Sequence, residues 1–202
     1  NCGFTLAPAR SGQRELVVRN LERAEDISAD AMAAGIDWTW ETYPEYLDSV
    51  ERLPKGINYA GYVGHSALRT WAMGERAFTE QATADDLASM AKELRDSLRA
   101  GAIGFTTSRT FNHQTSDDRP VASRLASWDE VSALVGVMGE LGAGIFELAG
   151  EDVLPLVKSA HAPGRDRCPR KDEDDRRILL ILRRADELPG IQRLEERGRA
   201  LG

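Results

Sequence analysis

The order of elements between residues 83 and 149 constrains the fold more than any other feature of this sequence. Thr83 to Asp86 is typical of a capping box, with Asp in place of the preferred Glu, and predicts the start of a helix. That helix has one apolar face at helical spacing, made of Leu87, Met90, Ala91, Leu94 and Leu98. A short strand is expected at 102–107 and another at 145–149, with a second helix between them. Alternating helices and strands favour a parallel sheet with right-handed crossovers, an α/β fold, but do not separate a barrel from an open sheet.

The second helix should begin at another capping box, Ser127 to Glu130, and should bury a face of Val131, Leu134, Val135, Met138 and Leu141. Before it lies a long polar loop, residues 108–126. Loops of this length in compact domains are often functional.

The first part of the chain predicts a helix over 15–34 that Gly35 ends, and a short helix over 44–51 with Pro44 in its first turn. Residues 57–63 indicate a buried strand, with His65 at its end and a short helix over 67–73 behind it. We therefore expect residues 1–155 to form one α/β unit.

The character of the chain changes at about residue 156. Residues 161–175 are highly charged, 178–182 form a tight apolar cluster, and 192–200 look like a charged helix. We expect residues 156–202 to be a linker with a helical or disordered tail, explained by a frameshift, a truncation or a wrongly assigned gene end, or by a genuine extension.

Charge and composition exclude several classes of function. The net charge is −7, so the surface repels phosphate backbones and broad nucleic-acid binding is not expected. No apolar run is long enough to span a membrane, and no signal peptide is visible, although Asn1 in place of Met suggests a start further upstream. Two cysteines do not suggest a disulfide framework, and a reducing cytoplasm is the expected compartment.

Candidate functional residues follow the predicted strands, because parallel α/β folds place their sites at the carboxyl ends of strands. Cys2 is either a thiolate ligand for zinc or a small buried apolar residue. His65 is either a ligand or base, or a histidine that closes a strand by bonding to backbone. Ser108, Arg109 and His113 are candidates for substrate contact, and His113 fits an exposed loop position equally well.

Three further residues carry weaker signals. Glu147 faces either a polar barrel centre or an exposed edge. Cys168 has basic neighbours that would lower its pKa, but it fits an incidental thiol in a linker better. His161 and Cys168 have no second pair, so a zinc knuckle is not supported.

Four ordered segments resemble the N-acyl-D-amino-acid deacylases, also called D-aminoacylases, of the amidohydrolase superfamily. Residues 1–8 resemble N-C-G-x-x-x-A-P, residues 62–69 resemble V-G-H-[GS]-x-[LV]-R, and residues 99–107 resemble A-G-A-x-G-[FL]-S-[TS]. Residues 44–48 fit the segment before the second motif, and the resemblance covers about residues 1–150.

This resemblance implies a (β/α)₈ barrel, of which the chain would be an incomplete piece. It implies metal-dependent hydrolysis of the carbon–nitrogen amide bond of N-acyl-D-amino acids, with zinc activating water and Cys2 at the position of a zinc ligand. Phe111 stands where the family often has tyrosine, which puts the substrate class in question. The family's paired histidines, its two later histidine ligands and its late aspartate have no counterparts in this sequence, so we expect no complete site.

Two other functions fit the sequence. One is a non-catalytic binding protein derived from the barrel. The other is a cyclic-amide hydrolase of the hydantoinase kind, which needs a carboxylated lysine at a strand end; Lys55, Lys92 and Lys158 lie in none of the predicted strands. A partial barrel also leaves sheet edges unpaired, which predicts self-association.

Overall fold

The computed structural model describes residues 3–142, 144–149, 169–171 and 177–181. Its centre is a sheet of three parallel strands in chain order, β1 (Tyr62–Gly64), β2 (Gly104–Ser108) and β3 (Ile145–Ala149). Antiparallel strands β5 (Arg177–Ile181) and β4 (Pro169–Lys171) continue the sheet beyond β3. The α/β prediction is confirmed.

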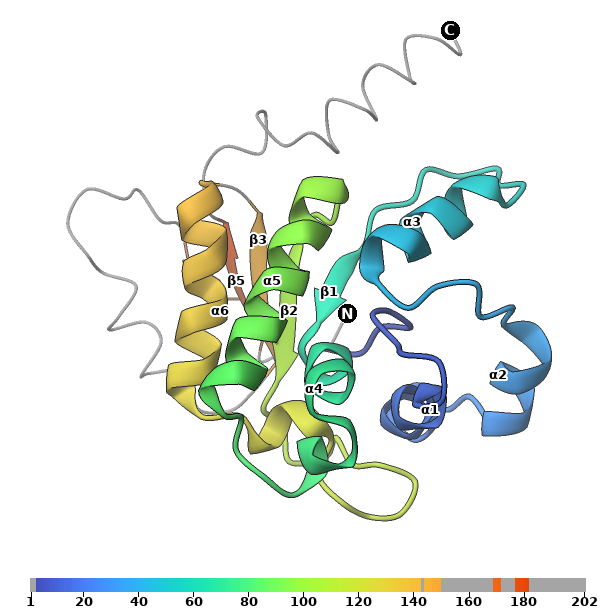
Figure 1. Ribbon diagram of the computed structural model, residues 1–202, viewed down its shortest axis with the longest axis horizontal. Helices are drawn as coiled ribbons and strands as arrows, with labels where there is room; N and C mark the ends of the chain where they lie inside the picture. Colours follow the sequence, from blue (N-terminus) through green and yellow to red (C-terminus); the bar gives the residue numbers. More distant parts are fainter. Residues whose placement is uncertain (1–2, 143, 150–168, 172–176, 182–202) are drawn as a thin grey trace, which may run out of the picture.

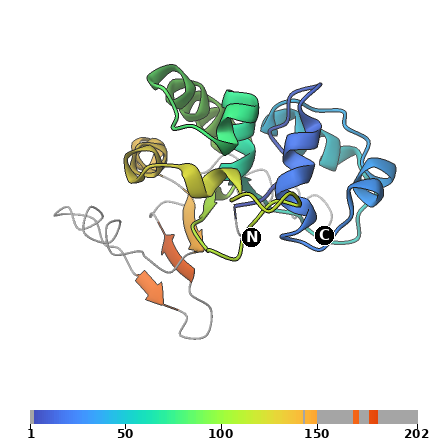
Figure 2. The same ribbon diagram turned by 90° about the horizontal axis from the view of Figure 1, so that it is seen from below.

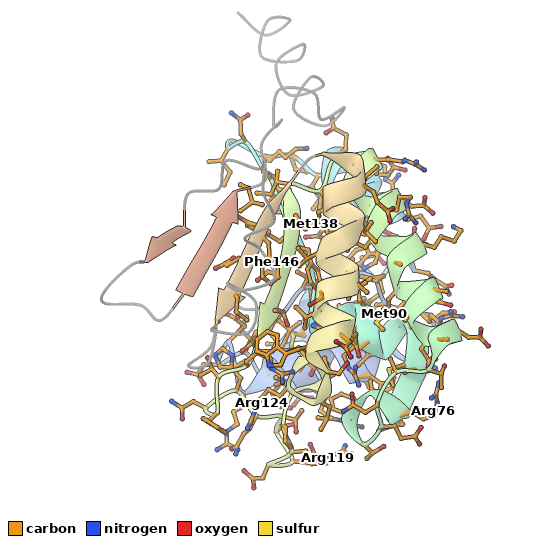
Figure 3. All side chains as sticks on the ribbon, turned by 90° about the vertical axis from the view of Figure 1, so that its left-hand side faces the viewer. Arg76, Met90, Arg119, Arg124, Met138 and Phe146 are labelled. Atoms are coloured by element: carbon orange, nitrogen blue, oxygen red, sulfur yellow. The ribbon has the colours of Figure 1, made fainter. Side chains whose placement is uncertain are left out.

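Helices α4 (His65–Met73), α5 (Ala84–Ala100) and α6 (Trp128–Leu141) cover one face of the parallel strands (Figure 1). The core between them holds Phe105 and Phe146, whose rings stack with centroids 5.8 Å apart. Met90 and Met138 enter the same layer from α5 and α6 (Figure 3). Because the strands alternate their faces, Gly104, Thr106 and Ser108 point away from these helices.

The remaining helices lie on the other side of β1 from β4 and β5 (Figure 2). They are α1 (Arg14–Glu22), α2 (Ala29–Gly35) and α3 (Tyr43–Arg52), while the short 3₁₀ helices η1 (Gly74–Phe78) and η2 (Ala122–Leu125) follow α4 and precede α6. Within the described ranges, none of these helices combines the length and the apolar character that a bilayer crossing requires.

Two elements in the first part of the chain are shorter than the sequence predicted. The helix expected over 15–34 is broken into α1 and α2, because Asp26 adopts a left-handed φ of 54° between them. The buried strand expected over 57–63 is only the three residues of β1. Ile57 is 80% exposed, because no described strand pairs with the free edge of the sheet at this point.

The tail also departs from its prediction where the structure describes it. Residues 178–181 of the apolar cluster lie in β5, where a linker or helix was expected, and β5 pairs with the edge of β3 that a partial barrel would leave open. A β-branched and leucine-rich run suits a strand that extends a sheet. Cys168, His161 and Lys158 lie outside the described residues, as does the helix expected over 192–200.

Candidate functional site

The carboxyl ends of β1, β2 and β3 lie at one edge of the sheet, where Gly64 pairs with Thr106 and Ser108 pairs with Ala149. The loop after β2 leaves from this end, at the lower side of Figure 1. The N-terminal segment crosses the same end: Gly3 accepts a hydrogen bond from the backbone N–H of Ser66 at 3.3 Å, and Thr5 Oγ1 accepts one from Gly64 at 3.1 Å.

Gly3 packs so tightly that no larger residue fits. Its φ is 90°, and a Cβ at this position would lie 2.9 Å from the backbone nitrogen of Ser108. The chain therefore passes directly against the ends of β1 and β2. Cys2, the predicted zinc ligand, lies outside the described residues, so its role stays a prediction.

Two of the predicted substrate-contact residues are brought together. Ser108 Oγ and His113 Nδ1 are 2.5 Å apart, and Phe4 packs edge-on against the imidazole with ring centroids 5.0 Å apart. Ser108 is fully buried and its carbonyl accepts a hydrogen bond from the Ser123 hydroxyl. A hydroxyl that is hydrogen-bonded to an imidazole can be activated or can bind a polar ligand.

Arg109, the third predicted contact, is turned toward the helices. Its guanidinium donates to the carbonyls of Ser123 and Ala126 and lies over the Trp128 ring, 5.0 Å from the centroid. Burial lowers the pKa of Arg109. These contacts tie the loop after β2 to the start of α6; substrate contact by Ser108, Arg109 and His113 stays a prediction.

A buried network lies behind this end of the sheet. His65 donates or accepts at both ring nitrogens, with Thr107 Oγ1 at 2.7 Å from Nδ1 and Glu130 Oε1 at 2.8 Å from Nε2. The other oxygen of Glu130 accepts a hydrogen bond from Arg69. His65, Thr107 and Arg69 are completely buried and Glu130 is 3% exposed, so the network connects α4, β2 and α6 out of contact with solvent.

The charges in this network are set by its own contacts. Burial lowers the pKa of His65 in spite of the neighbouring Glu130, so the imidazole is neutral at pH 7. Burial alone would raise the pKa of Glu130, but the hydrogen bond from His65 and the charge of Arg69 hold it below its ordinary value. The network is therefore an ion pair between Arg69 and Glu130 that a neutral histidine completes.

Sequence reasoning missed most of this network. His65 was expected to bind a ligand or bond to backbone, whereas it bonds to two side chains. Glu130 was assigned to a capping box, but only half of that box forms: Ser127 accepts from the Glu130 N–H while the carboxylate turns to His65 and Arg69. The spacing of His65 and Arg69, four residues apart on one helical face, was the available signal.

The described residues do not supply a metal centre. No group of three or more His, Cys, Asp or Glu side chains among them is placed to hold a metal ion. The strand ends carry Gly64, Ser108 and Ala149, which offer no histidine or carboxylate. Glu147 is 7% exposed, on the opposite face of β3 from Phe146, and its charge adds to burial in raising the pKa of Tyr62.

Comparison with other sequences identifies relatives of this chain, although no family model matches it. An uncharacterised protein of Mycobacterium tuberculosis is 35% identical over 151 residues, which cover 70% of this chain and 24% of that protein. D-aminoacylase of Alcaligenes xylosoxydans xylosoxydans is 25% identical and N-acyl-D-glutamate deacylase of the same organism is 29% identical. Each of those two alignments covers 82% of this chain and 30% of the relative, so the chain spans less than a third of their length.

Solved structures of deacylases are also similar to this chain. A D-aminoacylase studied for its binuclear metal centre matches with a TM-score of 0.50 and 25% identity, over 71% of this chain and 26% of that one. N-acyl-D-glutamate deacylase of Bordetella bronchiseptica, in complex with zinc and a phosphonate mimic of the tetrahedral intermediate, matches with a TM-score of 0.50 and 26% identity, over 71% and 25%. The expected resemblance and the partial barrel architecture are both confirmed.

Proposed function

We propose that this chain, a homologue of D-aminoacylase and N-acyl-D-glutamate deacylase, serves the hydrolysis of the amide bond of an N-acyl-D-amino acid. One observation carries the proposal: the similarity to both deacylases covers 82% of the chain in sequence and 71% of it in structure. We assign Cys2 as one ligand of a metal ion, zinc as that metal, and Ser108, Arg109 and His113 as the substrate side of the site. We place the protein in the cytoplasm, because its two cysteines do not suggest a disulfide framework.

The described residues do not fit a complete metal centre, so we derive no metal-dependent step from them. They do provide a loop after β2 that side-chain hydrogen bonds hold in place. Ser108 and His113 form one pair at the end of β2, and Arg109 anchors the following backbone to η2 and α6. In the proposed role, this pair donates and accepts hydrogen bonds to polar atoms of the bound amide.

The test is release of free amine from N-acetyl-D-amino acids in the presence of added zinc. We expect the 202-residue chain to release none, because a catalytic zinc needs three or more protein ligands. In a longer natural protein that contains this segment, we expect turnover of the D-substrate, and loss of turnover in the Cys2→Ala variant. Full activity of Cys2→Ala would contradict the ligand assignment, and turnover by the isolated chain would contradict the expectation of an incomplete site.

A non-catalytic binding protein is the second candidate, favoured by the lack of a metal-ligand group among the described residues. Equal binding of an N-acetyl-D-amino acid with and without zinc, and no turnover by the longer protein, would favour it. The cyclic-amide hydrolase has less support, because β1, β2 and β3 contain no lysine. Lys55 instead donates to backbone carbonyls at the end of α3, and Lys92 pairs with Asp96 on α5.

A further inference from the structure

The tip of the loop after β2, residues 113–120, folds as a small hairpin of its own. Gln114 and Pro120 form an isolated antiparallel bridge, and the Thr115 N–H donates to the Arg119 carbonyl at 2.8 Å. The Thr115 hydroxyl accepts a hydrogen bond from the Arg119 N–H at 3.1 Å. Because these bonds lie inside the hairpin, it can move as a unit without losing its own structure.

Both ends of the hairpin are anchored by buried contacts. Before it, the Arg109 guanidinium donates to two backbone carbonyls within residues 123–126. After it, Val121 is completely buried in an apolar cluster, and the Ala122 N–H donates to Asn20 Oδ1 at 3.1 Å. Movement of the hairpin is therefore confined to the residues between these two anchors.

Exposed charged side chains fasten the tip of the hairpin to α1 and η1. Asp118 pairs with Arg23, and the two side chains are 81% and 48% exposed. Arg119 lies over the Phe78 ring, 5.2 Å from its centroid, and its Nη2 is 3.9 Å from Glu75 Oε2. Exposed ion pairs contribute little stability, and added salt weakens them further. The tip is therefore held less firmly than the base.

Arg124 provides a separate fastening, from η2, and lies with Arg119 at the lower end of the molecule in Figure 3. It donates to the carbonyls of Phe111 and His113 at 3.0 and 3.2 Å. Its partners are neutral carbonyls, so this contact is less sensitive to salt than an ion pair.

The burial of Ser108 gives movement of the hairpin a consequence for the proposed site. Ser108 is completely buried, and its hydroxyl lies 2.5 Å from Nδ1 of His113, the first residue of the hairpin. An amide can reach this hydroxyl only after the hairpin has moved away.

We propose that residues 113–120 form a lid over Ser108, which opens when the contacts of its tip are lost and which carries His113 away from Ser108. Closure rebuilds the pair of Ser108 and His113 around a bound ligand, and ionic strength sets the open fraction in its absence. The inference rests on the proposed contact of these two residues with an amide.

The experiment measures access to position 108 in the 202-residue protein. Ser108→Cys is labelled with iodoacetamide, and mass spectrometry follows the peptide that contains this position. Ser97→Cys is the matched control, since Ser97 is also a completely buried serine but lies inside α5. We expect position 108 to react at least about ten-fold faster than position 97, because a local opening is more frequent than the opening of a core helix. Circular dichroism establishes that each variant is folded.

Asp118→Asn tests the fastening of the lid. It removes the charge, while asparagine tolerates the φ of 62° at this position. We expect labelling of position 108 to become about two- to five-fold faster, with no change at position 97. Raising NaCl from about 0.05 M to about 0.5 M should have the same effect on the charged lid and a smaller one on Asp118→Asn. Asp96→Asn, which removes an exposed pair with Lys92 on α5, should leave position 108 unchanged.

Carbethoxylation of His113 in the unsubstituted chain is a second measurement that needs no cysteine variant. Diethyl pyrocarbonate should modify His113 faster at the higher salt concentration, with the completely buried His65 as the internal control. Equal labelling of positions 108 and 97, or rates that neither salt nor Asp118→Asn changes, would overturn the lid. Neither measurement uses turnover, so the lid and the proposed amide hydrolysis can fail separately.

Discussion

At the scale of single residues, Glu130 holds two buried partners at once. Its carboxylate accepts from Arg69 on one oxygen and faces His65 on the other, inside the layer between α4, β2 and α6. Removing one partner of a buried ion pair is costly, because the remaining charge stays buried without compensation.

We expect Glu130→Gln to lower the free energy of unfolding by about 3–5 kcal/mol, since Arg69 then lacks an anionic partner. The measurement is urea denaturation at pH 7. The control is Glu140→Gln in the same helix, where the carboxylate is 65% exposed and pairs with Arg95. That change should cost less than about 1 kcal/mol, and equal losses in both variants would contradict the ion-pair assignment.

The same network predicts acid sensitivity. The folded pKa of His65 lies below its ordinary 6.5, so the unfolded chain binds a proton more readily and stability falls as the pH drops below about 6.5. The folded pKa of Glu130 lies below 4.5, so its contribution is lost as the pH falls further. The urea midpoint should decrease steadily from pH 7 to pH 4, with a smaller decrease above pH 5 in His65→Gln. A flat midpoint between pH 7 and pH 5 would count against a neutral buried imidazole.

Substitution of Tyr43 is expected to increase the stability of the fold, in contrast to the substitutions in the buried network. Because its hydroxyl is buried without a partner among the described residues, Tyr43→Phe should raise the free energy of unfolding by about 1 kcal/mol. Thermal unfolding measures this as a higher Tm. Tyr46→Phe serves as the comparison, since it removes a satisfied hydroxyl and should give no increase. A lower Tm for Tyr43→Phe would mean that its hydroxyl is satisfied.

At the scale of elements, local signals predicted α5 well. The Thr83 hydroxyl accepts a hydrogen bond from the N–H of Asp86, and the Asp86 carboxylate accepts one from the N–H of Thr83, as the capping-box pattern indicated. The helix then ends at Gly101, which has a φ of 123°. Both ends depend on contacts within a few residues, which is why the sequence alone was sufficient.

We expect Thr83→Ala to destabilise the protein by about 1 kcal/mol, because the first turn of α5 loses its side-chain acceptor. Ser89→Ala, inside the same helix, should be neutral or slightly stabilising, since alanine has the higher helix propensity. Urea midpoints of the two variants provide the comparison. If they were equal, the cap would not be contributing.

Elements whose form depends on distant contacts were predicted poorly. Residues 57–63 have a strand-like composition, but only Tyr62–Gly64 find a partner in β2. The helix predicted over 15–34 is interrupted near Asp26, which adopts a left-handed φ, and α1 and α2 then pack into one apolar cluster through Val17, Leu21 and Met32. The pairing of Ser108 with His113 could be anticipated from their shared loop, whereas the pairing of His65 with Glu130 joins residues 65 positions apart.

At the scale of the whole molecule, the sheet has one parallel edge without a described partner, that of β1. Ile57 and Leu53, 80% and 60% exposed, lie just before it in the chain. An edge that no described strand pairs with, beside exposed apolar residues, favours pairing with another chain.

We therefore expect the chain to self-associate in a concentration-dependent way, as sedimentation velocity can show. Ile57→Lys should shift the population toward monomer, because a lysine beside an edge opposes strand pairing. Ile27→Lys is the control, at an exposed isoleucine in the connection between α1 and α2. A stable monomer at all concentrations would contradict this prediction.

The antiparallel strand β5 determines whether a further parallel strand can add to the sheet beside β3. It occupies the hydrogen-bonding groups along β3 that the next parallel strand of a barrel would need. The two arrangements exclude each other, since one backbone edge can serve a single neighbour. Completion of a barrel from this side would first require the displacement of β5. In this arrangement β5 therefore blocks the addition of a further parallel strand beside β3.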